Sequence, residues 1–180
     1  MASQVGFLYI PNRCIQCWAC QVSCKQWHGI KAGSIARRVV VDTVEGEFPK
    51  VVRTFNSKAC NHCKTPACLE ACPVGAISKR EDNGAVVVDQ DTCIACKTCV
   101  EACPYDVPQY DAEHDNKMDK CDHCMSLNVG DGEETRCVQT CPTQALHSGT
   151  LEELKKKAEE MGLSVEPLDG QLNPSVLIAK

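Results

Sequence analysis

Residues 92–105 read TCIACKTCVEACPY, and this stretch decides how the chain folds. It contains four cysteines with the spacing Cys-x2-Cys-x2-Cys-x3-Cys-Pro, namely Cys93, Cys96, Cys99 and Cys103. This run is typical of a loop that binds a [4Fe–4S] cluster. Three thiols at such short intervals can surround part of a cubane, while the fourth is carried away by the next turn and ligates a second cluster. The stretch therefore predicts a cluster-binding loop that needs a partner loop.

The remaining cysteines repeat this pattern along the chain. All 16 cysteines fall into four groups of four, which are Cys14, Cys17, Cys20 and Cys24; Cys60, Cys63, Cys68 and Cys72; Cys93, Cys96, Cys99 and Cys103; and Cys121, Cys124, Cys137 and Cys141. The second group has two extra residues before its third cysteine, and the fourth group has ten. Proline follows the last cysteine of every group except the first. A fourfold repeat without a spare thiol predicts four fully ligated clusters.

Zinc and disulfide bonds are the competing explanations for so many cysteines. The first ten residues carry no basic segment of a secretion signal, whereas a disulfide framework is typical of exported proteins. Zinc sites are built from pairs of Cys-x2-Cys elements and need no third cysteine at the next interval. The spacing therefore favours iron, with four [4Fe–4S] clusters as the cofactors.

Pairing of the groups follows from the rule that the last cysteine of one loop ligates the cluster of another. Groups two and three are separated by only 20 residues, 73–92, so we expect them to form an inner pair and groups one and four an outer pair. The predicted ligand sets are Cys60, Cys63, Cys68 with Cys103; Cys93, Cys96, Cys99 with Cys72; Cys14, Cys17, Cys20 with Cys141; and Cys121, Cys124, Cys137 with Cys24. A tandem pairing, one with two and three with four, stays open, although it leaves 35 residues, 25–59, between groups one and two.

Short strands connect the cysteine groups. Residues 7–10 predict a strand that leads into group one. Two hairpins are predicted, from residues 38–44 and 50–55 around Glu45-Gly46, and from residues 76–78 and 85–88 around Asn83-Gly84. The short helices after groups two and three should end early, because proline follows each group.

The predicted fold class is α+β, built around two pairs of cysteine groups that are nested along the chain. We expect residues 1–56 and 112–150 to form the outer half, residues 57–111 the inner half, and residues 151–180 a C-terminal helix and tail. A capping box, Thr150-x-x-Glu153, predicts that this helix begins at Leu151. The tail after it is expected to pack on its own domain.

Charge and hydropathy exclude several classes of protein. The net charge is −5 with acids and bases interspersed, so nucleic acid is not an expected partner. No run of 18 apolar residues is present, which argues against direct insertion into a membrane. There is no nucleotide-binding fingerprint and no acid–base pair, so the chain is not expected to be an enzyme by itself. The absence of an export signal predicts a cytoplasmic protein.

Several polar and aromatic side chains lie next to the cysteines in sequence. His62 and His123 are not expected to be ligands, because every group already has four thiols, and we expect them to shape the surroundings of the clusters. Lysines beside the cysteines could raise a cluster's reduction potential, but solvent exposure is the simpler expectation for Lys64, Lys97 and Lys120.

Group one is flanked by two tryptophans, and group four contains a long insertion. Trp18 and Trp27 could shield a cluster or face a partner, with core packing as the default expectation. The insertion Met125–Arg136 is either a docking loop or a plain surface loop.

Three segments resemble a known family. They are Cys60-Asn-His-Cys63 with its later Cys72-Pro73, Cys103-Pro104-Tyr105 with Pro108-x-Tyr110, and Lys120-Cys121-Asp122 with its later Cys141-Pro142-Thr143. Over residues 5–150 the chain resembles the four-cluster [4Fe–4S] electron-transfer (beta) subunits of dimethyl sulfoxide reductase-type molybdenum or tungsten oxidoreductases. The resemblance implies a fold of two interleaved two-cluster ferredoxin-like halves related by a pseudo-twofold axis, together with the nested pairing. It also implies a large molybdenum- or tungsten-pterin catalytic subunit as partner. A further electron-carrier or membrane subunit is compatible with it.

The resemblance also implies a function. The chain is expected to relay single electrons through four clusters to or from the catalytic subunit. The alternatives are the electron-transfer subunit of a tungsten aldehyde oxidoreductase and a free-standing polyferredoxin. Since relatives can be exported together with a signal-bearing partner, a periplasmic location is the alternative to a cytoplasmic one.

Overall fold

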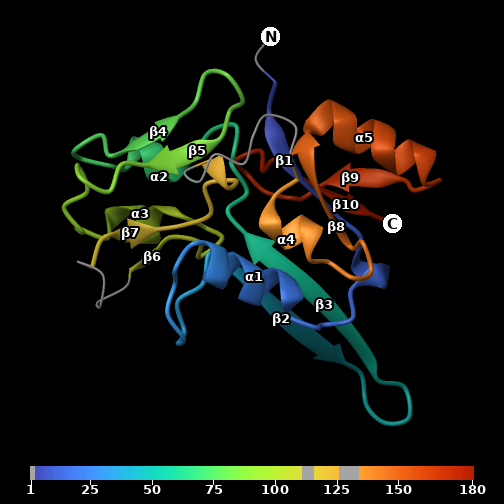
Figure 1. Cartoon of the computed structure of the whole chain (residues 1–180). Helices are drawn as coiled ribbons and strands as arrows, with labels where there is room; N and C mark the ends of the chain where they lie inside the picture. The colour runs from blue at the N-terminus through green and yellow to red at the C-terminus, as the bar shows by residue number, and fades with distance from the viewer. Residues whose placement is uncertain (1–2, 111–115, 126–133) are drawn as a thin grey trace.

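Short helices and short strands follow one another along the chain in a mixed α and β fold (Figure 1). The computed structural model describes residues 3–110, 116–125 and 134–180. Its strands form one four-stranded sheet and three two-stranded ones. Among the helices in these ranges, none has the length and apolar composition needed to cross a bilayer.

The largest sheet joins the two ends of the chain. Its strand order is β8 (Leu146–Thr150), β1 (Val5–Tyr9), β10 (Val176–Ala179) and β9 (Val165–Pro167). Strand β1 runs antiparallel to β8, which follows group four, and parallel to β10 near the C-terminus. The strand predicted before group one is therefore confirmed, and it lies beside the segment that leaves the last cysteine group.

Strand β1 is buried over its whole length, because both of its faces are covered. Side chains alternate between the faces of a strand. Phe7 and Tyr9 pack in a cluster that contains cysteines, whereas Leu8 and Ile10 pack on the opposite side with Leu154. The strand thus separates the cysteine-rich interior from a purely aliphatic one.

Helix α5 (Leu151–Glu160) covers the aliphatic face of the sheet. The Oγ1 of Thr150 accepts a hydrogen bond from the Glu153 N–H at 3.2 Å, and the Glu153 carboxylate accepts one from the Thr150 N–H at 2.9 Å. This reciprocal pair is the predicted capping box. The prediction that the tail packs on its own domain is also confirmed, since β9 and β10 belong to the sheet.

Two of the small sheets are the predicted hairpins. β2 (Arg38–Glu45) pairs with β3 (Val52–Ala59), and this hairpin projects beyond the rest of the molecule in Figure 1. Its second strand begins later than predicted and continues to Ala59, because residues 46–51 form the turn. β4 (Ile77–Lys79) pairs with β5 (Val86–Val88) as predicted. A third pair joins β6 (Gln109–Tyr110) and β7 (Met118–Asp119).

Each cysteine group contains one short helix. They are α1 (Ala19–Trp27), α2 (Ala67–Glu70), α3 (Thr98–Ala102) and α4 (Arg136–Gln139), and a 3-10 turn, η1 (Pro11–Arg13), precedes group one. Helix α1 has 9 residues and the other three have 4 or 5. Only group one lacks the proline after its last cysteine, so its helix can continue past Cys24. Helix α1 packs against α4, and α2 packs against α3.

Candidate functional site

The sixteen cysteines line the interior of the protein and none forms a disulfide bond. All of them are buried or half-buried except Cys17 and Cys96, which are exposed. A disulfide framework is therefore not how the chain uses its thiols.

Three cavities are each lined by four cysteines. These sets are Cys14, Cys17, Cys20 and Cys141; Cys72, Cys93, Cys96 and Cys99; and Cys60, Cys63, Cys68 and Cys103. Every set combines three cysteines of one group with the last cysteine of another. The fold thus brings together thiols that are up to 127 positions apart in the chain, as Cys14 and Cys141 are (141 − 14 = 127).

The other four cysteines also lie close to one another. Burial, together with the neighbouring thiols of Cys137 and Cys124, raises the pKa of Cys24 to about 12. Burial likewise raises the pKa of Cys121 well above its usual value, and Cys24 and Cys137 add to the effect. These electrostatic contacts join three cysteines of group four to the last cysteine of group one.

The arrangement of the thiols fits a cluster better than a single metal ion. A zinc ion holds four ligands at about 2.3 Å from one point. Among the described residues, which include every cysteine, no three Cys, His, Asp or Glu side chains are placed to hold one ion together. The thiols stand instead around cavities, as the larger [4Fe–4S] cubane requires.

Left-handed backbone conformations shape the cysteine loops. The residue before the second cysteine has a positive φ in every group, and these residues are Gln16 (57°), His62 (42°), Ala95 (58°) and His123 (61°). Turns of this kind form concave arrays of N–H groups that bind anions. None of these four residues is glycine, which adopts this conformation most readily, so the sequence carried no sign of it.

The turns after the last cysteines are also alike. The third residue after the cysteine has a positive φ at Gly75, Asp106 and Gln144. In two of these turns the next N–H donates to the sulfur, from Ala76 to Cys72 Sγ at 3.3 Å and from Ala145 to Cys141 Sγ at 3.2 Å. Hydrogen bonds to the sulfurs are among the factors that set a cluster's reduction potential.

The two histidines beside the cysteines tie segments of backbone together. His62 Nδ1 accepts a hydrogen bond from the Val86 N–H at 3.0 Å, and His123 Nε2 lies 3.2 Å from the Gly6 carbonyl oxygen, to which it donates as the Nε2–H tautomer. Burial lowers the pKa of both rings, so both are neutral. Their ring centroids are 5.6 Å apart.

Lysine exposure differs from the sequence expectation at one position. Lys64 and Lys97 are exposed as predicted, but Lys120 is buried and that prediction was wrong for it. Its Nζ donates hydrogen bonds to the Val86 carbonyl and, at 3.2 Å, to the Cys121 carbonyl. Two buried acceptors from different segments therefore draw this lysine into the interior.

Neither tryptophan packs in the core, so that default expectation was wrong. Trp18 is 49% exposed and Trp27 is 39% exposed. The guanidinium carbon of Arg136 lies 3.6 Å from the centroid of the Trp27 ring. Helix α1 lies on the surface of the molecule, and its buried residues are Cys20 and Cys24. Most of the predicted loop Met125–Arg136 lies outside the described residues.

One aromatic contact at a cysteine was not anticipated. The hydroxyl of Tyr110 lies 3.1 Å from Cys99 Sγ. Burial and the nearby Cys99 thiol raise the pKa of Tyr110, so its hydroxyl keeps its proton and can donate to the sulfur. A tyrosine that follows Pro108 was visible in the sequence, but its contact depends on the pairing of β6 with β7.

Two family models match the chain. The model described as a 4Fe-4S dicluster domain matches residues 51–151, and the model described as a 4Fe-4S binding domain matches residues 11–27. Together they span all four cysteine groups.

Curated proteins resemble the chain over most of its length. It is 41% identical over 165 residues to YnfG, a probable anaerobic dimethyl sulfoxide reductase subunit of Escherichia coli (strain K12), covering 87% of this chain and 78% of that protein. It is 39% identical over 176 residues to the B subunit of anaerobic dimethyl sulfoxide reductase from the same organism, covering 93% and 83%. It is 33% identical over 156 residues to protein NrfC of that organism, covering 87% and 70%.

Replacing the buried lysine tests its structural role. Lys120→Met should lower the free energy of unfolding by about 1–3 kcal/mol, because the buried Val86 and Cys121 carbonyls lose their donor. The measurement is the denaturant midpoint for loss of cluster absorbance in the anaerobic holoprotein. Lys64→Met is the exposed control and should leave the midpoint unchanged, whereas equal midpoints for both variants would contradict the assignment.

Proposed function

Because this chain belongs to the 4Fe–4S dicluster family that includes the B subunits of the anaerobic dimethyl sulfoxide reductases, we propose that it is the electron-transfer subunit of such an enzyme. It relays single electrons through four [4Fe–4S] clusters to or from a large molybdenum- or tungsten-pterin subunit, and it has no catalytic activity of its own. The observation that carries the proposal is the set of sixteen thiols arranged as four groups of four neighbours. The relatives do not favour a tungsten aldehyde oxidoreductase or a free polyferredoxin.

The proposed ligand sets are the nested ones. They are Cys14, Cys17, Cys20 and Cys141; Cys121, Cys124, Cys137 and Cys24; Cys60, Cys63, Cys68 and Cys103; and Cys93, Cys96, Cys99 and Cys72. Three cysteine-lined cavities and the electrostatic contacts of Cys24 support these sets. The tandem pairing would join group one to group two, which none of these contacts favours.

We further propose two ferredoxin-like halves related by a pseudo-twofold axis, with residues 1–56 and 112–150 in the outer half, 57–111 in the inner half, and 151–180 as an added helix and tail. Packing of α1 on α4 and of α2 on α3 supports the division. Groups one and three share left-handed residues on both sides of the second cysteine, and groups two and four share a left-handed histidine before it. The axis would pass near the neighbouring rings of His62 and His123.

This symmetry gives an order to the clusters. The loops that contain His62 and His123 meet at the centre, so the clusters of groups two and four are the middle steps. The exposed cysteines, Cys17 and Cys96, belong to groups one and three, so these clusters lie nearest the surface. An electron would pass from group one to group four, then to group two and group three, or in reverse.

The two ends of this path present different surfaces. Ile15 and Trp18 line the cavity of the group-one cysteines, and Val22 follows on helix α1. All three are exposed, and we call them the apolar collar of this site. At the other end Ile94 is equally exposed, but Lys97 stands where group one has Trp18. Permanent interfaces are more apolar than transient ones. We therefore assign the collar to the catalytic subunit and the group-three end to a further electron carrier or membrane subunit.

The cytoplasmic location stays a prediction, with co-export as its alternative.

Serine variants test the nested ligand sets. Cys141→Ser should alter the same EPR feature of the reduced holoprotein as Cys17→Ser, because both cysteines ligate one cluster. Cys24→Ser should alter the feature that Cys124→Ser alters. The nested pairing is wrong if Cys141→Ser instead changes the feature of Cys124→Ser.

Two matched aspartate variants test the proposed function and the assignment of the collar to the catalytic subunit. The tagged chain, purified anaerobically from its own cells, should carry a large subunit with molybdenum or tungsten. Ile15→Asp should reduce the bound metal tenfold or more, because a buried charge at an interface centre costs about 2 kcal/mol or more. Ile94→Asp, equally exposed at the equivalent position, should retain it.

The controls and contrary outcomes are distinct. Both aspartate variants should hold the same amount of iron as the unaltered chain. Equal retention of the large subunit by both variants would overturn the assignment of the collar to the catalytic subunit. A chain that purifies alone and exchanges electrons with several soluble enzymes would overturn the proposed function in favour of a polyferredoxin.

A further inference from the structure

A buried arginine lies between the outer cysteine groups. Arg38 is the first residue of β2, and only 2% of it is exposed. Its guanidinium lies 4.5 Å from the centroid of the Phe7 ring. Nη1 donates hydrogen bonds to the Ser57 carbonyl at 3.2 Å and to Ser57 Oγ at 3.1 Å. Nε and Nη2 have no hydrogen-bond partner within the described part of the chain.

The Phe7 ring against which this guanidinium lies belongs to the side-chain cluster that contains Cys20, Cys121 and Cys137. Burial lowers the pKa of Arg38, but the nearby cysteines Cys137, Cys121, Cys20 and Cys24 together outweigh burial and raise it. In the proposed ligand sets, Cys20 belongs to one outer cluster and the other three belong to the second. Arg38 therefore faces both outer clusters.

Ser57 connects the arginine to one sulfur. Its Oγ accepts from Arg38 and lies 3.5 Å from Cys20 Sγ, so its own proton is available to that sulfur. A hydroxyl that accepts from a cation is a stronger donor, because hydrogen bonds in a chain polarise one another.

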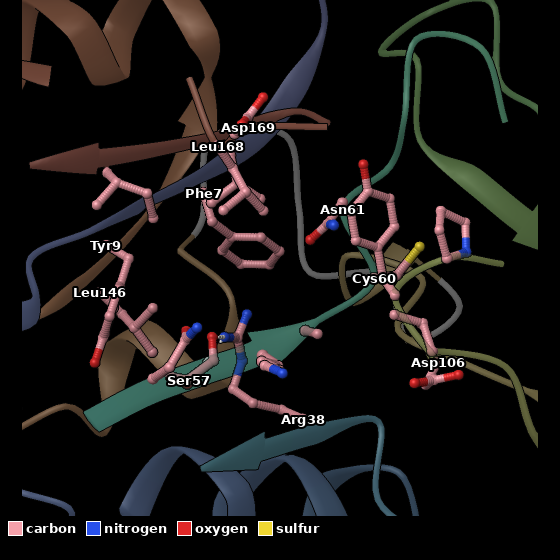
Figure 2. Close-up of a pocket in the computed structure, with 18 residues that line it drawn as sticks. Phe7, Tyr9, Arg38, Ser57, Cys60, Asn61, Asp106, Leu146, Leu168 and Asp169 are labelled. Atoms are coloured by element: carbon pink, nitrogen blue, oxygen red, sulfur yellow. Dashed lines mark hydrogen bonds between the residues drawn. The ribbon is translucent and has the colours of Figure 1, made fainter. Parts of the chain in front are cut away.

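The other side of Arg38 faces the junction of the two halves. A cavity of about 280 Å³ is lined by Arg38 and Ser57 on one wall and by Tyr105 and Asp106 on the other. Figure 2 shows the Arg38 side chain rising from its strand toward Phe7, beside Ser57. The guanidinium is thus held at the boundary between the cavity and the outer cysteines.

A buried, incompletely paired guanidinium is costly unless an anion balances it. A [4Fe–4S] cluster with four thiolates is such an anion, and it gains one further negative charge when it is reduced. A fixed cation stabilises the reduced form more than the oxidised form, and the low dielectric of the interior strengthens this effect. Arginine keeps its proton throughout, so no proton transfer accompanies the electron.

We propose that Arg38 is a counter-charge shared by the two clusters of the outer pair, those of groups one and four, and that it raises the reduction potential of both. Ser57 acts on the group-one cluster alone, through Cys20. The inference rests on the proposed function and its ligand sets. The step concerned is the one-electron reduction of each cluster by the electron carrier that precedes it in the path, in which no bond of the protein forms or breaks. Arg38 and Ser57 are positioning residues, since they act through cysteine sulfurs.

Potentiometric EPR titration of the anaerobic holoprotein tests the pair, after the Cys17→Ser and Cys124→Ser variants have identified the two outer features. Arg38→Gln should lower both outer midpoint potentials and leave the inner two unchanged. Ser57→Ala should lower only the potential of the feature that Cys17→Ser identifies. Arg53→Gln removes an equal charge from the exposed part of the same hairpin, where Arg53 pairs with Asp42 at 2.7 Å, and should shift none.

A variant that retains the charge separates this role from a purely structural one. Arg38→Lys should keep both outer potentials close to those of the unaltered chain, although it loses the hydrogen-bond geometry of the guanidinium. If Arg38→Gln fails to assemble its clusters, the midpoint potentials of Arg38→Lys and Ser57→Ala together decide whether the proposal holds. Unchanged outer potentials in Arg38→Gln with all clusters present, an equal shift of all four clusters, or a large fall in Arg38→Lys would overturn the proposal. Iron content and the cysteine variants test the ligand sets separately. Failure of the proposed function can therefore be distinguished from failure of the role proposed for Arg38.

Discussion

Ligation of iron by thiols from distant parts of the chain is the constraint on which the rest of the structure depends. The side-chain clusters that the described residues form are small, and two of them are completed by cysteines. Only 4% of the residues are aromatic, so side-chain packing alone supplies a thin core. In the proposed ligand sets, each bond to a last cysteine closes a loop between two groups. Such bonds supply folding free energy that the core does not.

The polar interior is arranged around these anionic centres. Arg38 and Lys120 are cations in the interior, and both lie beside cysteine groups. His62 and His123 stay neutral and hold backbone segments in place beside groups two and four. The left-handed residues of the loops belong to turns of a kind in which backbone N–H groups can bind an anion. In our proposal one of these features, Arg38, also raises the reduction potentials of the group-one and group-four clusters.

Local patterns in the sequence predicted the elements that depend on local interactions. The strand before group one, both hairpins and the capping box of α5 were all visible, because turn residues and caps act over a few positions. The ligand sets were predicted from spacing and remain a proposal supported by the cavities. The burial of Lys120 and the exposure of Trp18 and Trp27 were not predictable, because they depend on which segments meet in space. Arg38 carried no signal for the same reason, since its thiol neighbours come from groups one and four.

The central claim is that all sixteen cysteines serve four complete clusters. The most direct measurement is the content of iron and acid-labile sulfide in the anaerobically purified chain, referred to its protein concentration. The account predicts about 16 iron atoms and about 16 sulfides per chain. A value near eight of each would contradict it, as would zinc in place of iron.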